Sequence, residues 1–268
     1  MDKPREPNNV HRLISLESHS LRGRGIYLLP NLFTTSALFA GFYAIVASIH
    51  GHFEGAAIAI FVAMVLDGVD GRIARMTNTQ SAFGAEYDSL ADMVSFGVAP
   101  AILAYEWLLH ETGKLGFLAA FVYTSAAALR LARFNSQAAT TDKKFFKGLP
   151  SPASAAVVAG FIWCGHEYGF QGSGVVIALT FIVTVLCGAL MVSNIRYYSF
   201  KDLNLRGRVP FVIVLGVVLG FGLISLHPPT VLMLGFLSYA VSGPIITLNQ
   251  LQRRRRERRD GRSGRDVV

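Results

Sequence analysis

From residue 31 onwards the chain alternates between long apolar stretches and short polar connections. Each apolar stretch is close to the ~20 residues that an α-helix needs to cross the hydrocarbon core of a bilayer. The pattern predicts eight such helices, over residues 31–49, 54–75, 88–109, 115–135, 151–167, 174–194, 210–226 and 230–251. The expected fold is therefore an all-α integral membrane protein with eight transmembrane helices.

The composition agrees with this interpretation, because 52% of the 268 residues are hydrophobic and only 16% are charged. A soluble domain of ordinary composition carries more charge. Residues 1–25 are polar and lack the apolar core and cleavage site of a signal peptide, so we expect a cytoplasmic N-terminal segment there. Residues 26–251 would form one membrane domain, and residues 252–268 a polybasic cytoplasmic tail.

Basic residues are distributed very unevenly among the connections. Eight crossings place both termini on one side of the membrane, and 24 of the 25 Lys and Arg residues fall on that side. Lys114 is the exception. Because cytoplasmic loops carry the excess of Lys and Arg, the pattern predicts cytoplasmic termini and a multi-pass protein of the cell's inner membrane.

The tail contains eight arginines between Arg253 and Arg265, which could suggest a nucleic-acid partner. Its position directly after the last predicted helix favours anionic lipid instead, which attracts such segments by about 1 kcal/mol per charge. We therefore expect the lipid bilayer, and no nucleic acid, as the partner of the tail. Cys164 and Cys187 lie inside apolar stretches and are expected to be packing residues.

Four aspartates between residues 66 and 100 are the main candidates for chemistry: Asp67, Asp70, Asp88 and Asp92. A carboxylate near the centre of a membrane helix costs about 2.5 to 3.5 kcal/mol, so four together need compensating cations. Helical geometry separates the first two by about 60° and the last two by about 40°, which gives each helix one acidic face. An antiparallel hairpin would join the two faces at the cytoplasmic end. Oxygen ligands without His or Cys favour Mg²⁺ or Mn²⁺, with Ca²⁺ as an alternative.

Three nearby residues suit a phosphorylated ligand. Gly71 and Gly84 lack side chains and would let a bulky ligand approach the backbone. Arg75, one turn beyond Gly71, can contact a diphosphate with its planar fork of donors. The predicted site therefore holds a metal-bound pyrophosphate.

These residues match the pattern D-x2-D-G-x2-A-R-x8-G-x3-D-x3-D at every position, which resembles the signature of the CDP-alcohol phosphotransferase family. The matching residues are Asp67, Asp70, Gly71, Ala74, Arg75, Gly84, Asp88 and Asp92. The resemblance implies transfer of a phosphatidyl group from CDP-diacylglycerol to a small alcohol with release of CMP. It also implies a homodimer.

Residue by residue, the resemblance implies that Asp67, Asp70 and Asp88 bind two metal ions. Asp92 would lie at the metals, as a fourth candidate metal residue, and act as the general base. The CDP moiety would contact the four remaining signature residues, Gly71, Ala74, Arg75 and Gly84.

Three further segments resemble the phosphatidylserine synthase branch of that family and indicate L-serine as the acceptor. They are RLARFN (130–135), FKGLPSPA (146–153) and MVSNIRYYSFKDL (191–203). Within them, Arg133 and Lys147 are candidate partners for the serine carboxylate, and Asn135 for its ammonium group. Glycerol 3-phosphate, inositol phosphate and choline are the alternative acceptors.

A cation-coupled transporter is the alternative from a different class, since transporters also carry intramembrane acids. It does not explain the interleaved glycines and arginine. Transporter sites also lie near the membrane midplane, whereas the four acids are predicted at one membrane face.

Overall fold

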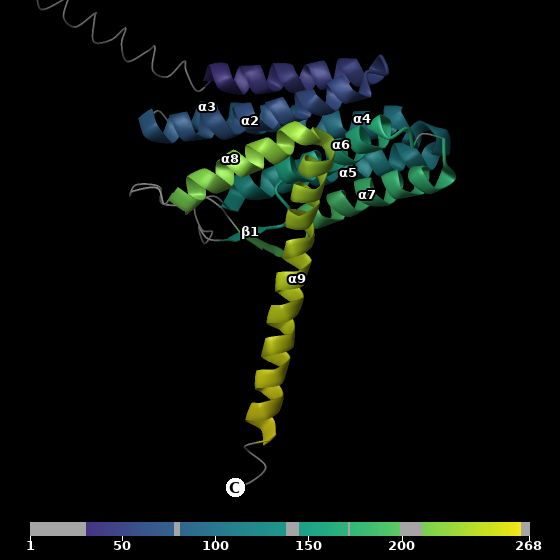
Figure 1. The fold of residues 1–268 in the computed structure, drawn as a ribbon. Coiled ribbons are helices and arrows are strands. Elements are labelled where there is room, and N and C mark those ends of the chain that lie inside the picture. The colour runs from purple at the N-terminus through teal and green to yellow at the C-terminus, as the bar shows by residue number, and fades with distance from the viewer. Residues whose placement is uncertain (1–30, 78–80, 138–144, 171, 199–210, 264–268) are drawn as a thin grey trace, which may run out of the picture.

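The computed structural model describes residues 31–77, 81–137, 145–170, 172–198 and 211–263, which form a helical bundle (Figure 1). Its helical elements, in chain order, are the N-terminal helix (Asn31–Ile49), α2 (Phe53–Thr77), α3 (Ala82–Asp92), a π-helical turn (Met93–Val98), α4 (Ala99–Trp107), a 3₁₀ turn (Leu109–Thr112), α5 (Lys114–Gln137), α6 (Ser151–Glu167), α7 (Gly174–Val192), α8 (Phe211–Leu226) and α9 (Pro228–Ser263).

The predicted helices are present, but two of them have different limits. The third begins at Ala82 rather than Asp88, because the Ser81 side chain caps its N-terminus by accepting a hydrogen bond from the Gly84 amide at 3.0 Å. It is also interrupted by the π turn. The last helix continues past residue 251 to Ser263, through an arginine-rich stretch of good helix formers.

A short antiparallel ribbon was not predicted. It pairs β1 (Phe145–Lys147) with β2 (Arg196–Tyr198), with Lys147 opposite Arg196. Both strands lie in segments that the sequence analysis left as connections. Their aromatic residues favour strands, but the pairing joins positions about fifty residues apart and leaves no local pattern.

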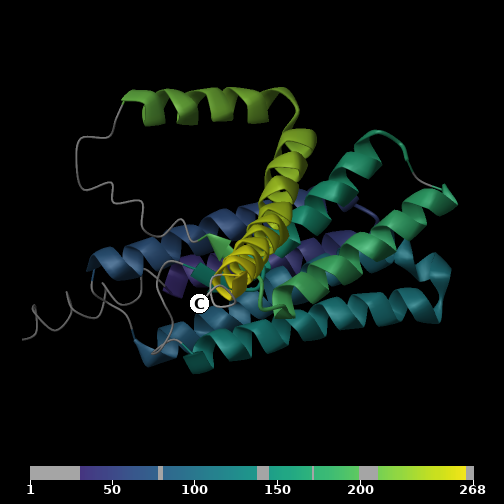
Figure 2. The ribbon, with the colours of Figure 1, turned by 90° about the horizontal axis from the view of Figure 1, so that it is seen from below.

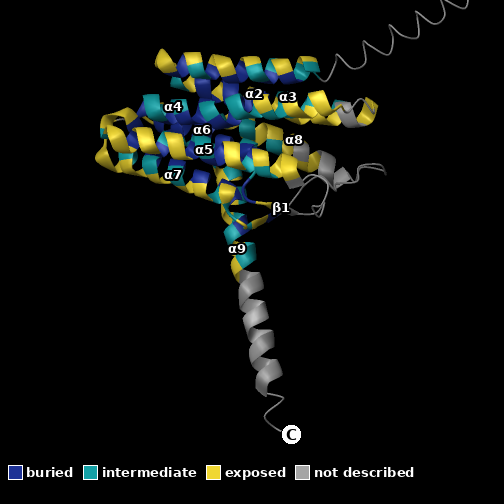
Figure 3. Cartoon of the chain, turned by 180° about the vertical axis from the view of Figure 1, so that it is seen from behind, coloured by how far each residue is buried: buried dark blue, intermediate teal, exposed yellow. Residues whose placement is uncertain are grey.

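The bundle is organised around α6, which packs against α2, α4, α7 and α9. Figure 3 shows buried positions gathered in the middle of the bundle and exposed positions around it. Many of the exposed positions carry large apolar side chains, including Phe39, Phe42, Phe117 and Phe121. An apolar exterior around a helical core is what a lipid-embedded protein requires.

Four helices of the described part are long and apolar enough to cross a membrane: Asn31–Ile49, Lys114–Ser136, Gly174–Val192 and Pro228–Leu248. The others differ for identifiable reasons. α2 carries Asp67, Asp70 and Arg72, and α3 and α4 are separated by the π turn. α6 and α8 are shorter, with 17 and 16 residues. The structure thus agrees with an all-α membrane protein, while eight crossings and the orientation of the termini stay predictions.

α9 leaves the bundle at a steep angle (Figure 1). Seen from below, α8 lies apart from the other helices and contacts α9 (Figure 2). Pro244 interrupts the hydrogen bonding of α9 because proline has no amide proton. The Tyr197 hydroxyl donates a 3.0 Å hydrogen bond to the Ala240 carbonyl, the acceptor that Pro244 leaves free. Gly243 makes room, since a Cβ there would overlap the Tyr197 ring. The ribbon therefore anchors α9 at its irregular point.

Candidate active site

Three of the four signature aspartates meet where α2 lies beside α3. Asp67 and Asp70 on α2 and Asp88 on α3 each offer a carboxylate oxygen, and these oxygens lie within 4.8 Å of one another. Asp92, the last residue of α3, lies within hydrogen-bonding reach of Asp67. The predicted convergence of the two acidic faces is therefore present in the fold.

The N-terminal helix completes one side of this cluster. Thr34 is buried, and its Oγ1 donates a 2.7 Å hydrogen bond to Oδ2 of Asp70, which is also buried. The bond fixes one carboxylate oxygen and leaves the other to a ligand. Sequence reasoning did not identify this contact, because Thr34 precedes Asp70 by 36 positions and has no motif of its own.

The cluster concentrates negative charge in a small space. Asp88 is repelled by Asp70, and Asp92 by both Asp67 and Asp88. Carboxylates packed this closely need a cation between them. The donor set contains oxygen only, as Mg²⁺ and Mn²⁺ prefer, so these residues fit hard divalent ions.

The two signature glycines have different surroundings. A Cβ at Gly71 would meet no atom of the described residues within 4 Å, so among these residues that turn of α2 is open beside the acids. A Cβ at Gly84 would lie 3.1 Å from Ser81 Oγ and 3.6 Å from Asn31 Oδ1. Ala74 and Arg75 lie on α2, but their side chains are outside the described part of the structure.

The three predicted acceptor residues, Arg133, Asn135 and Lys147, each have different neighbours. Asn135 exchanges hydrogen bonds with Ser89 on α3, at 3.0 and 3.3 Å, which brings the end of α5 next to Asp88. Arg133 turns toward α7, where its Nη1 donates to the Val192 carbonyl at 3.2 Å and its Nη2 to Asn194 Oδ1.

Lys147 lies on the ribbon opposite Arg196, and both residues are exposed. Cross-strand partners share one face of a sheet, and like charges in such a pair repel each other. An anion bound between or beside the two would relieve this repulsion. Arg196 is a candidate that sequence reasoning missed, although it lies in the quoted segment 191–203.

Arg130 is the second residue that sequence reasoning missed. Its Nη1 donates a 2.6 Å hydrogen bond to Oγ of Ser151, the first residue of α6. Its charge interacts with Asp92 and Asp67, so it adjoins the acidic cluster. An arginine inside an apolar helix was itself a signal of a functional position.

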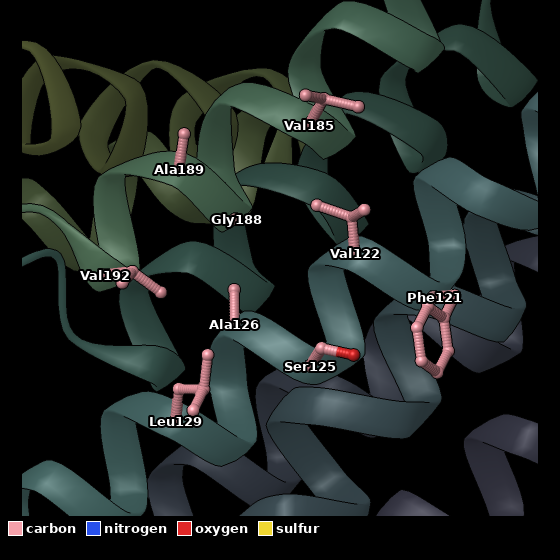
Figure 4. A pocket seen from close by; sticks show the side chains of 9 residues that line it. All are labelled: Phe121, Val122, Ser125, Ala126, Leu129, Val185, Gly188, Ala189 and Val192. Atoms are coloured by element: carbon pink, nitrogen blue, oxygen red, sulfur yellow. The ribbon is translucent and has the colours of Figure 1, made fainter.

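An apolar pocket lies elsewhere, between α5 and α7 (Figure 4). Its lining includes Phe121, Ala126, Leu129, Val185 and Gly188, and no acidic residue. Charged phosphorylated ligands need polar partners when they leave water. The aspartate cluster, not this pocket, is therefore the candidate centre of chemistry.

Comparison with known proteins agrees with the geometry. Residues 27–192 match the family model described as CDP-alcohol phosphatidyltransferase. A protein of Helicobacter pylori named CDP-diacylglycerol–serine O-phosphatidyltransferase is 42% identical over 191 residues, covering 71% of this chain and 79% of the relative. Proteins of the same name from Methanocaldococcus jannaschii (36% over 186 residues, 69% and 81% covered) and Mycobacterium leprae (31% over 239 residues, 86% and 78% covered) are similar too.

Proposed function

The chain belongs to the CDP-alcohol phosphatidyltransferase family, and from this premise we propose that it transfers the phosphatidyl group of CDP-diacylglycerol to the hydroxyl of L-serine. The products are phosphatidylserine and CMP. The observation that carries the proposal is the convergence of Asp67, Asp70 and Asp88, whose oxygens lie within 4.8 Å, in a chain 42% identical to a serine phosphatidyltransferase.

The site would hold two Mg²⁺ or Mn²⁺ ions through Asp67, Asp70 and Asp88, with Asp92 adjoining them. Bound ions of this kind neutralise a pyrophosphate and stabilise the leaving phosphate. The Thr34 hydroxyl orients Asp70 for this role by occupying its Oδ2. The open side of Gly71 supports its proposed place, with Ala74, Arg75 and Gly84, along the CDP moiety.

Asp92 takes the proton in the proposed reaction. The serine hydroxyl oxygen bonds to the phosphorus that carries diacylglycerol, while the bond from that phosphorus to the oxygen of CMP breaks. The hydroxyl proton passes to the Asp92 carboxylate, and CMP leaves with the electron pair of the broken bond. Arg130 lies close enough to Asp92 for its charge to offset part of the repulsion from Asp67 and Asp88.

The acceptor would bind between the ends of α5 and α7 and the ribbon. Lys147 and Arg133 would pair with the serine carboxylate, and Asn135 with the ammonium group. The exposed Lys147 and Arg196 pair supports an anionic group at this place. Serine, unlike glycerol 3-phosphate, inositol phosphate or choline, brings both a carboxylate and an ammonium group to it.

We place the site at the cytoplasmic face of the inner membrane, because 24 of the 25 basic residues fall on the side predicted to carry the acids. The polybasic segment 252–268 would then contact anionic lipid. A homodimer in the bilayer is the proposed assembly, as the family resemblance implies.

The test is an assay of the purified full-length protein with CDP-diacylglycerol, a divalent ion and separate acceptors. We expect CMP release with serine and little with glycerol 3-phosphate, inositol phosphate or choline. Ethanolamine, which lacks the carboxylate, is the matched control and should be a poor acceptor, because the cationic partners are left unpaired. EDTA should abolish release. Preference for glycerol 3-phosphate would overturn the acceptor assignment, and full turnover in EDTA would overturn the metal assignment.

A further inference from the structure

The helix that carries Asp88 and Asp92 changes its geometry immediately after Asp92. Residues Met93–Val98 form a π-helical turn, and the amide of Ala99 reaches back five residues to the Val94 carbonyl. A π turn contains one more residue than an α turn and is frequently found at functional sites. At about 100° per residue, the extra residue sets how α3, with its acids, is rotated relative to α4 in the core.

Side chains from a neighbouring helix hold the carbonyl groups of this turn. The Tyr123 hydroxyl of α5 donates to the Phe96 carbonyl at 3.2 Å, and Thr124 lies 3.4 Å from the Gly97 carbonyl. Tyr123 and Phe96 are both fully buried. The residue four positions after Phe96 is Pro100, which has no amide proton, so the Tyr123 hydroxyl supplies a hydrogen bond that Pro100 cannot. Thr124 also donates to the Ala120 carbonyl of its own helix at 3.0 Å, so Tyr123 is the main partner of the turn on this side.

The N-terminal helix holds the turn from another side. Ser95 Oγ donates a 3.1 Å hydrogen bond to the Ala37 carbonyl. Gly41 allows this approach, since a Cβ there would lie 2.7 Å from Ser95 Cα. The same helix carries Thr34, the hydrogen-bond partner of Asp70, so one rigid element contacts both the metal cluster and the turn.

We propose that the π turn orients the Asp92 carboxylate, and that Tyr123 is a positioning residue for the reaction, acting through the Phe96 carbonyl. The inference rests on the proposed function, in which Asp92 takes the serine proton. Tyr123 itself contacts no reacting atom. Loss of its hydroxyl lets the turn shift and displaces Asp92, which adjoins it. Asp88 lies one helical turn further along α3 and is kept in place by the hydrogen bonds between Ser89 and Asn135, and Asp67 and Asp70 lie on α2.

The experiment compares Tyr123→Phe with Tyr197→Phe. Both residues are fully buried tyrosines whose hydroxyl donates to a helical carbonyl that lacks its usual amide partner because the residue four positions later is proline, Pro100 after Phe96 and Pro244 after Ala240. Both variants should lower the melting temperature. Only Tyr123→Phe should lower kcat, by about tenfold to a hundredfold, as small misplacements of catalytic groups do. Its KM for CDP-diacylglycerol and its Mn²⁺ affinity should stay at the wild-type values.

A double-mutant cycle with Asp92→Asn separates positioning from general damage. If Tyr123 acts through Asp92, then Tyr123→Phe has no further effect on the residual kcat of Asp92→Asn, whereas independent effects multiply. Ser95→Ala removes the hydrogen bond between the turn and the N-terminal helix, so it should lower kcat as Tyr123→Phe does. Three results would each overturn the inference. They are equal kcat values for Tyr123→Phe and Tyr197→Phe, effects on kcat that multiply in the cycle, and a lower Mn²⁺ affinity in Tyr123→Phe. A wild type that releases no CMP with serine would instead overturn the proposed function and the inference with it.

Discussion

At the residue scale, the four aspartates of α2 and α3 differ in what surrounds them. Asp67, Asp70 and Asp88 direct oxygens at a common point, and Asp70 is held there by Thr34. Asp92 lies at the edge of this group, beside Arg130. The charge of Arg130 interacts with Asp92 and also with Asp67, so it offsets part of the repulsion within the cluster. The proposed function accordingly assigns the first three to metal binding and Asp92 to proton transfer.

This assignment predicts that Asp→Asn substitutions at Asp70 and Asp92 differ in their effect on Mn²⁺ binding. Asp70→Asn should lose Mn²⁺ binding and activity together, because it removes a charged ligand from the cluster. Asp92→Asn should keep most Mn²⁺ and CDP-diacylglycerol affinity while kcat falls by about 10² to 10⁴, the usual cost of losing a general base. Mn²⁺ titration and CMP release, measured on the same preparations, check both. Normal turnover by Asp92→Asn would assign the proton transfer to another group.

Thr34 provides a finer test of the metal site. Thr34→Val keeps the shape of the side chain but removes the 2.7 Å hydrogen bond to Asp70. Partners that orient metal ligands contribute about 10- to 100-fold in affinity, so Mn²⁺ binding should weaken by that amount. Thr180→Val is the matched control, because Thr180 is also buried but bonds the Val176 carbonyl within α7. Equal Mn²⁺ affinity in the two variants would contradict the role of Thr34.

At the scale of elements, the α2–α3 hairpin could be predicted from the sequence, but the contacts that hold the site in place could not. Helical periodicity placed Asp67 with Asp70 and Asp88 with Asp92, and the short connection between the helices implied that the two pairs meet. The Thr34–Asp70 contact, the Arg130–Ser151 contact and the ribbon join residues distant in sequence, so no local pattern reports them. The π turn was also missed, because its residues read as an ordinary apolar helix.

The ribbon and the adjoining end of α7 lead to a prediction about the acceptor. Lys147→Ala removes an exposed cation, so we expect a serine KM raised by about tenfold, the usual scale for a charged hydrogen bond, with no change in melting temperature. Arg133→Ala should raise the serine KM too, but it also removes the bonds to Val192 and Asn194 and should lower the melting temperature. Kinetics with varied serine, combined with thermal unfolding, distinguish the two.

Lys114→Ala is the control for these variants, since Lys114 is predicted to lie on the opposite side of the membrane. Its serine KM should match that of the wild type. CDP-diacylglycerol KM should be unchanged in all three variants, because the nucleotide is proposed to contact α2 and not the ribbon. If both Lys147→Ala and Arg133→Ala used serine normally, the acceptor site would lie elsewhere even with the metal cluster intact.

At the scale of the whole molecule, large apolar side chains are exposed around the bundle, while the acids gather at one place between α2 and α3. In the proposed function, this arrangement would bring a lipid substrate and a water-soluble one to the same place. CDP-diacylglycerol can stay in the bilayer with its head group at the acids, and serine can enter from water. The basic residues predict that this water is the cytoplasm.

The last prediction tests that orientation. Single cysteines are introduced at Thr79, Lys114 or Ser263 after the buried Cys164 and Cys187 have been replaced. Thr79 lies in the connection between α2 and α3, outside the described residues, whereas Lys114 begins α5 and Ser263 ends α9. A membrane-impermeant maleimide applied to intact cells should label only the Lys114 position, and the other two should react after the cytoplasmic face is exposed in inverted vesicles. The reason is that only Lys114, of the 25 basic residues, falls on the predicted outer side. Labelling of the Thr79 and Lys114 positions from the same side would mean that the chain between them does not cross the bilayer. The acids would then lie on the same side as Lys114, and the placement of the site among the cytoplasmic basic residues would be wrong.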